Sequence, residues 1–156
     1  GVSSDSSGAI QVIADAPVVV TARTYNVGDV GTFGQFLPGV EMRQTMTAGQ
    51  TGVLSLLSST DRFRTNVGFI NLGEQQVQVR VTVYNASGQS LGSRNMAIPP
   101  GAWKQQNDIF GAVGAGMVAN GYAEVEVLTQ GGTVWGYASV VDDPPGDPTT
   151  VPIVIQ

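Results

Sequence analysis

The chain contains no cysteine and no histidine, and each absence removes a class of chemistry. Without cysteine there are no disulfides, thiolate metal sites or cysteine nucleophiles. Without histidine the chain lacks the commonest general base and the commonest transition-metal ligand. Any catalysis would depend on carboxylates, hydroxyls and a single lysine, so the composition favours a protein that is not an enzyme.

Charge is also scarce. Charged residues make up 12% of the 156 residues, and the net charge is −5, whereas globular proteins typically contain about 25% charged residues. The few basic residues are scattered, so the chain has no basic run of the kind that nucleic acid or an anionic membrane surface attracts. It also lacks a run of about 20 apolar residues, so the sequence predicts no membrane insertion.

The sequence is rich in segments where hydrophobic and polar residues alternate, and in residues that favour turns. Q-V-Q-V-R-V-T-V-Y (76–84) places valine at every second position, which is typical of a strand with one buried face. N-A-S-G (85–88) predicts a turn, and residues 89–98 predict the returning strand of a hairpin. Nine or ten such strands predict an all-β fold, an antiparallel sandwich of the immunoglobulin-like or jelly-roll-like kind. Pro17 and Pro152 suit open sheet edges, which favours a sandwich over a closed barrel.

Two segments are predicted along the chain. Residues 1–16 form an N-terminal extension that includes a short apolar strand, A-I-Q-V-I-A (9–14), and residues 17–156 form a single sandwich domain. Residues 40–46 predict a further strand. Residues 26–39 contain four glycines and predict a long loop, in which Phe33, Phe36 and Leu37 fold back over the core because their joint exposure would be costly.

G-Q-S-L-G (88–92) matches the G-x-S-x-G pattern that presents a nucleophilic serine in many hydrolases. That elbow needs a strand before it, a helix after it and a histidine to accept the proton. Ser90 instead follows a predicted hairpin turn, and the chain has no histidine. The pattern therefore predicts a turn.

Carboxylates occur at two places that could carry chemistry. Asp142, Asp143 and Asp147 lie within six residues and are a weak candidate for binding Ca²⁺, although turn geometry explains the same sequence. Glu124 and Glu126 share one face of a predicted strand, as a pair of glycosidase carboxylates would. Simple alternation on a solvated strand face also accounts for them. The sequence therefore predicts no cofactor, and Ca²⁺ at the three aspartates stays a weak candidate.

Aromatic side chains offer a surface for a ligand. Trp135 and Tyr137 lie two residues apart and therefore share one face of a strand. Together with Phe33 and Phe36 they are candidates for a surface on which a glycan stacks, although such side chains more often fill a sandwich core or pack on a hairpin neighbour.

A series of motifs runs through most of the chain in a fixed order. It comprises R-T-N-V-G-F-I-N-L-G (64–73), P-P-G-A-W (99–103), G-Y-A-E-V-E-V (121–127), V-W-G-Y-A-S-V-V-D (134–142) and G-D-P-T (146–149). This series resembles an uncharacterised β-sandwich module of secreted and surface proteins of bacteria, which is often repeated in large extracellular chains. The resemblance implies a secreted or cell-surface location and no catalytic residues.

These observations lead to one functional hypothesis and one alternative. The hypothesis is a non-enzymatic, secreted structural module that assembles with itself into a filament or surface layer. Its N-terminal strand would pair with the sheet edge of a neighbour and bury Ile10, Val12 or Ile13 there. The alternative is an adhesion module of a larger surface protein, which binds a carbohydrate or a protein.

Overall fold

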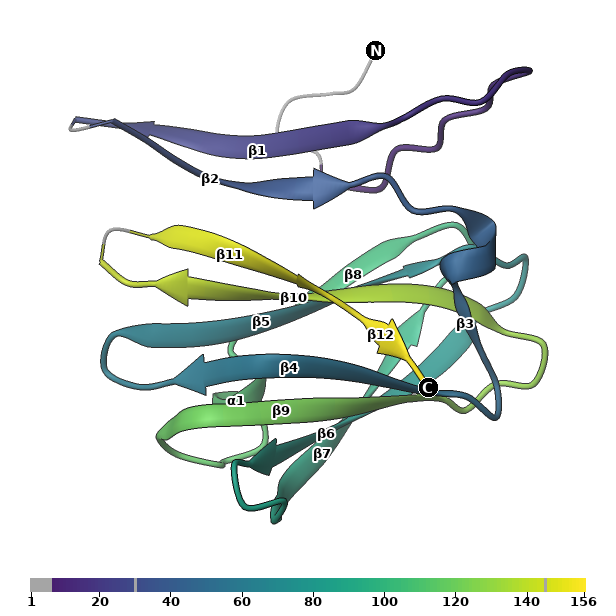
Figure 1. The fold of residues 1–156 in the computed structure, drawn as a ribbon. Helices are drawn as coiled ribbons and strands as arrows, with labels where there is room; N and C mark the ends of the chain where they lie inside the picture. The colour runs from purple at the N-terminus through teal and green to yellow at the C-terminus, as the bar shows by residue number, and fades with distance from the viewer. Residues whose placement is uncertain (1–6, 30, 145) are drawn as a thin grey trace.

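The computed structural model describes residues 7–29, 31–144 and 146–156. Two five-stranded sheets pack face to face, and a separate two-stranded hairpin lies outside them (Figure 1). The strand pairs are antiparallel in both sheets and in the hairpin. The predicted all-β sandwich is therefore confirmed.

The described residues contain twelve strands, more than the nine or ten predicted. The first sheet has the order β11 (Asp147–Pro152), β10 (Thr133–Asp142), β5 (Phe63–Asn71) and β8 (Trp103–Gln106), and β3 (Met46–Thr47) also pairs with β10. The second sheet has the order β12 (Val154–Ile155), β4 (Thr51–Ser59), β9 (Val118–Val127), β6 (Val77–Asn85) and β7 (Ser90–Ile98). The hairpin consists of β1 (Thr21–Gly28) and β2 (Gly31–Pro38), and the helical elements are η1 (Met42–Gln44) and α1 (Ile109–Ala112).

The core lies between the two sheets and follows the alternation of the sequence. The four valines of β6, at positions 77, 79, 81 and 83, are all fully buried. Val67 and Phe69 of β5 are buried with them in the same cluster, together with Phe110 of α1. Burying one such side chain contributes about 1.5–3 kcal/mol, so the alternating valines of β6 fix which face of that strand turns inward.

Residues 26–39 form most of the β1–β2 hairpin, so the prediction of a long loop is wrong. Packing explains at least one of the glycines that suggested a loop. Gly34 lies directly opposite Tyr25 in the register, and a side chain at Gly34 would collide with that tyrosine. Phe36 is 58% exposed, so the expected lid over the core does not form. The predicted strand 40–46 is replaced by η1 followed by the two residues of β3.

The two central strands of the first sheet are buried on both faces. Six consecutive residues of β10, 134–139, and five of β5, 65–69, are buried. One face packs on the second sheet. On the outer face, Tyr137 lies over Gly68, and Trp135 stacks on Tyr137 with ring centroids 5.9 Å apart. These buried aromatic side chains make the outer face a second, smaller apolar layer.

The chain passes from the first sheet to the second between β11 and β12. Residues of β11 pair with β10 in the first sheet, and residues of β12 pair with β4 in the second. Between them, Ile153 is buried and its N–H donates to the carbonyl of Gly136 at 3.1 Å. This crossing closes one side of the sandwich. In the described part of the chain, no helix has the length and hydrophobicity that a membrane crossing requires.

Candidate functional site

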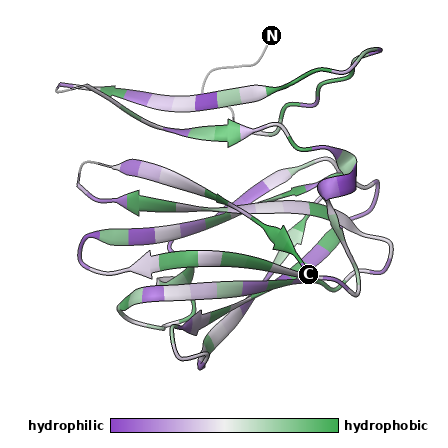
Figure 2. Cartoon of the chain, in the orientation of Figure 1, coloured by the Kyte–Doolittle hydropathy of each residue, from purple (hydrophilic) through white to green (hydrophobic). Residues whose placement is uncertain are grey.

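The N-terminal segment, residues 7–20, is the most exposed apolar part of the described chain. No described strand includes it, and its predicted strand 9–14 is unpaired. The exposed fractions of the three side chains expected to contact a neighbour are 88% for Ile10, 53% for Val12 and 86% for Ile13. Figure 2 shows hydrophobic residues along much of this segment. A contiguous apolar segment of this kind is typical of an interaction site.

The hairpin joins this segment to the sandwich. β2 lies alongside β11, where the Thr150 hydroxyl donates to the carbonyl oxygen of Phe36 at 2.7 Å. The Ser139 hydroxyl donates to Oε1 of Gln35 at 2.8 Å. β1, by contrast, is exposed at every residue. In the part of the hairpin that the structure describes, β2 makes the hydrogen bonds to the sandwich, and β1 presents a free edge.

The aromatic side chains considered for a ligand surface divide into two sets. Phe33 shares the Gln35 face of β2 and is half-buried, whereas Phe36 points the other way and is exposed. Trp135 and Tyr137 are each only 7% exposed. Of these four rings, Phe36 is the one that is open to solvent, so the sandwich does not present the four together as a stacking platform.

Two hydrogen bonds below the surface hold the hydroxyl group of Tyr137 in place. Its hydroxyl accepts a hydrogen bond from Nε1 of Trp103 at 3.2 Å and donates to Oε1 of Gln105 at 3.0 Å. Burial raises the pKa of Tyr137 above its usual value. These bonds give partners to the polar groups of Tyr137, which is buried, and of Trp103, which is half-buried. Aromatic side chains that pack inside a fold need such partners for their polar groups.

Ser90 is the first residue of β7 and directly follows the hairpin turn, as the sequence predicted. The side chain of Asn85 shapes that turn, because its Oδ1 accepts hydrogen bonds from the N–H groups of Ser87 and Gln89. A strand, not a helix, follows Ser90. The geometry of a nucleophile elbow is therefore absent here.

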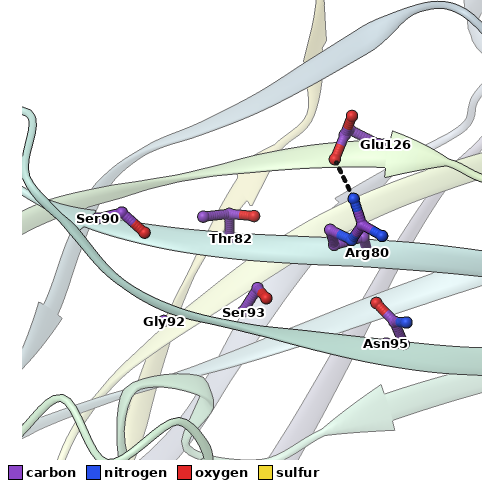
Figure 3. A pocket seen from close by; sticks show the side chains of 7 residues that line it. All are labelled: Arg80, Thr82, Ser90, Gly92, Ser93, Asn95 and Glu126. Atoms are coloured by element: carbon purple, nitrogen blue, oxygen red, sulfur yellow. Dashed lines mark ion pairs between the residues drawn. The ribbon is translucent and has the colours of Figure 1, made fainter.

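A shallow polar hollow lies on the outer face of the second sheet. Figure 3 shows its lining residues: Arg80, Thr82, Ser90, Gly92, Ser93, Asn95 and Glu126. Arg80 and Glu126 form an ion pair across β6 and β9, with Nη1 and Oε2 3.5 Å apart. The hollow offers hydrogen-bonding groups on a flat surface, which suits a polar ligand more than an apolar one.

Glu124 and Glu126 share this outer face, as alternation predicted, but each already has a partner. Glu124 Oε2 accepts a hydrogen bond from the Tyr84 hydroxyl at 2.9 Å. This bond, more than burial, raises the pKa of Tyr84. Tyr84 also stacks on Tyr122, with ring centroids 4.8 Å apart. The arrangement stabilises the sheet face and leaves neither carboxylate without a polar neighbour.

Two of the three carboxylates at 142–147 pair with arginines. Asp142 accepts two hydrogen bonds from Arg62, each 2.7 Å long, and this pairing lowers the pKa of Asp142. Asp143 lies 3.7 Å from Nε of Arg64, and Asp147 is exposed opposite Asp142 in the register. Among the residues that the structure describes, no three acidic side chains are placed to hold a metal ion.

The sequence did not single out two residues that the structure makes prominent. Asn71 is fully buried and binds three carbonyl groups, at Gln75, Ile98 and Pro99. Arg94 is the only charged residue of β7 and lies opposite the buried Val81. The available signal for Arg94 was a charged side chain within a strand, which is one of the means by which natural edge strands discourage pairing.

The fold defines the class of protein, an antiparallel β-sandwich with an N-terminal hairpin and an exposed apolar segment. Comparisons with known proteins add nothing to that class: no protein-family model, curated protein or solved structure matches the chain. The resemblance to a secreted bacterial module therefore stays a prediction.

Proposed function

We propose that this protein is a non-enzymatic, secreted structural module that assembles with other copies of itself through its N-terminal segment. The observation that carries the proposal is the exposed segment 7–20, which belongs to no described strand and whose Ile10 and Ile13 are almost fully exposed. An apolar extended segment gains backbone hydrogen bonds and buries its side chains when it is added to an open sheet edge. The secreted location is supported by the sequence resemblance alone.

The test is the assembly state of the full chain and of a variant lacking residues 1–16. We expect the full chain to form assemblies that grow with concentration, seen by sedimentation velocity and electron microscopy. The truncated variant should remain a folded monomer, because the sandwich core lies outside the deleted residues. Normal assembly of the truncated variant would rule the proposal out.

A matched pair of variants separates segment-specific contacts from general surface hydrophobicity. Ile13→Asp changes a side chain that is 86% exposed, and Val154→Asp changes one that is 61% exposed in β12. Neither should unfold the protein. Only Ile13→Asp should weaken assembly, because only that side chain is expected to be buried in the contact.

The second candidate is a module that binds a carbohydrate or a protein. The polar hollow of Figure 3 favours it, because Ser93, Asn95 and Glu126 are all exposed there. A glycan array with the full chain and with Asn95→Ala tests this candidate. Binding that is lost in the Asn95 variant, in a protein that stays monomeric, would favour it over self-assembly.

A further inference from the structure

The sandwich has several edge strands to which another strand could be added. They differ in length and in whether another part of the chain already lies beside them. On one side, β11 is flanked by the hairpin strand β2, and β12 has only two residues. On the other side, β8 has four residues and β7 has nine. Within the described residues, β7 pairs with β6 alone. β7 is therefore the longest open edge of the two sandwich sheets, whereas the free edge of β1 belongs to the separate hairpin.

Resting on the function proposed above, we infer that β7 is the edge that receives residues 11–16 of a second copy. The core-facing side of β7 is set by its register with β6. Ile98 and Met96 lie opposite Val77 and Val79 and are buried, while Arg94 lies opposite Val81 and is exposed. An added strand would thus meet apolar side chains along half of the edge and one positive charge near the other end.

The N-terminal segment has the complementary chemistry. Asp15 is the only charged residue between positions 7 and 20, and Arg94 is the only charged residue of β7. An antiparallel alignment that places Asp15 opposite Arg94 also places Ile13 opposite Met96. Directly opposed residues of opposite charge stabilise an antiparallel pair, as do opposed apolar residues. One alignment satisfies both contacts.

The same alignment also matches the point where hydrogen bonding is expected to end on each of the two strands. Pro17 has no N–H, so a ladder of hydrogen bonds is expected to end there. In the same alignment Pro17 lies opposite Gly92, and the regular pairing of β7 with β6 breaks between Gly92 and Ser90. The match therefore covers residues 11–16 of one copy and residues 93–98 of the other.

Arg94 gives the edge its selectivity. A charged side chain on an edge strand normally discourages pairing with other strands. A strand without an acidic residue in register would bury the guanidinium against apolar atoms, which is costly. Asp15 removes that cost, so the same arginine that repels other strands accepts this one.

The position of the two partners determines the kind of assembly. The N-terminal segment runs beside the β1–β2 hairpin, and β7 lies at the opposite end of the molecule (Figure 1). Each addition therefore leaves one free segment and one free edge. Contacts between two different surfaces propagate without closing, unless the rotation between copies happens to form a ring.

The charge pair provides the test in the full-length chain. Asp15→Arg and Arg94→Asp should each raise the concentration needed for assembly by about tenfold, because each change replaces attraction with repulsion. The double variant should restore assembly to near the original concentration. Arg94→Gln, which removes the positive charge without reversing it, should have a smaller effect, and circular dichroism checks that each variant folds.

Cross-linking tests the alignment, because the chain has no native cysteine. Ala14→Cys mixed with Asn95→Cys should give a disulfide-linked pair, since residues 14 and 95 are opposed in the proposed alignment. Ala14→Cys mixed with Thr51→Cys, on the far strand β4, should not. Failure to form the first pair, or equal formation of the second, would overturn the β7 assignment.

The outcomes distinguish this inference from the function on which it rests. If deletion of residues 1–16 abolishes assembly but the Arg94 and Asp15 changes have no effect, the segment is the donor and β7 is not the acceptor. If the full chain does not assemble, or if the deletion variant assembles normally, the proposed function fails and the inference fails with it. Loss in both single variants with recovery in the double variant supports both.

Discussion

Gly68 of β5 lies directly opposite Tyr137 of β10, and the tyrosine ring occupies the space that a side chain at position 68 would need. A Cβ added to Gly68 would lie 2.5 Å from Cε1 of that ring. The neighbouring pair repeats the relationship on the core side, where a Cβ on Gly136 would lie 2.6 Å from Cδ1 of Phe69. Each glycine makes room for the aromatic side chain across the strand pair.

The first prediction concerns this space. Gly68→Ala should destabilise the fold by about 1–3 kcal/mol, because the new methyl group must displace a ring that is packed and hydrogen-bonded. Urea unfolding followed by fluorescence measures the change. Gly73→Ala is the control, since the nearest atom to its added Cβ is 3.4 Å away. An equal loss in both variants would contradict the steric explanation.

The second prediction concerns Asn71, whose side chain joins two loops to the end of β5. Its Nδ2 donates to the carbonyl oxygens of Gln75, Ile98 and Pro99 at 2.7, 3.0 and 3.1 Å, and its Oδ1 accepts from the Gly73 N–H at 2.9 Å. Removing the side chain leaves buried polar groups without partners, at about 1–3 kcal/mol. Asn71→Ala should lower the free energy of unfolding by about that amount.

Asn71→Asp should be more damaging than Asn71→Ala at neutral pH. A carboxylate keeps the bond to Gly73 but turns a negative charge toward carbonyl oxygens that need donors. Chemical denaturation of both variants, beside Asn107→Ala at an exposed position, gives the comparison. The opposite order of stability would show that Asn71 acts through its volume and not through its hydrogen bonds.

The third prediction is a dependence of stability on pH in the acid range. The bidentate bond from Arg62 lowers the pKa of Asp142. A carboxyl whose pKa is lower in the folded state stabilises the fold at pH values above its unfolded pKa, and this contribution is lost as the pH falls through the folded pKa. Thermal unfolding should thus show a steeper loss below about pH 4 in the native chain than in Asp142→Asn.

Glu41→Gln is the matched control for that measurement. Arg43 also lowers the pKa of Glu41, but these two residues are only two positions apart. Their contact can therefore persist when the chain unfolds, and the difference between states is smaller. Arg62 and Asp142, which lie directly before β5 and at the end of β10, are brought together by the fold. Identical acid profiles for the native chain and Asp142→Asn would refute the prediction.

The fourth prediction concerns the ionisation of Tyr84. Glu124 raises the pKa of this tyrosine, chiefly because its carboxylate accepts the phenolic hydrogen. Glu124→Gln should lower the pKa of Tyr84, since a neutral amide stabilises the protonated phenol less. Two-dimensional NMR with labelled tyrosine follows the titration. Glu74→Gln, at an exposed position, should leave it unchanged. A Tyr84 pKa that is the same in Glu124→Gln would contradict the assignment.

The sequence alone predicted the features that depend on turn residues and on the alternation of buried and exposed residues along a strand. The buried valines of β6, the hairpin at Asn85 and the shared face of Glu124 and Glu126 follow from a period of two and from turn chemistry. These are local properties, because neighbouring residues in the chain determine them.

The features that the sequence did not predict depend on contacts between distant segments. The glycine-rich stretch 26–39 gave a loop signal, yet Gly34 is needed because Tyr25 lies across from it. Trp135 and Tyr137 were correctly placed on one face. Burial and a ligand surface were both consistent with the sequence, which could not decide between the two, because the burial depends on the packing of the two rings on each other and on Trp103 from a distant strand. Arg62 and Asp142 are 80 positions apart.

The strand that crosses between the sheets at Ile153 has a mechanical consequence. A pull on the last residues along the strand direction is carried at once by the hydrogen bonds of β12 to β4 and of β11 to β10. Those bonds lie across the direction of the load, so several must break together before either strand slips. The carboxyl end of the chain is thus fastened to both layers, and tension applied there is resisted in shear, not by peeling one bond after another.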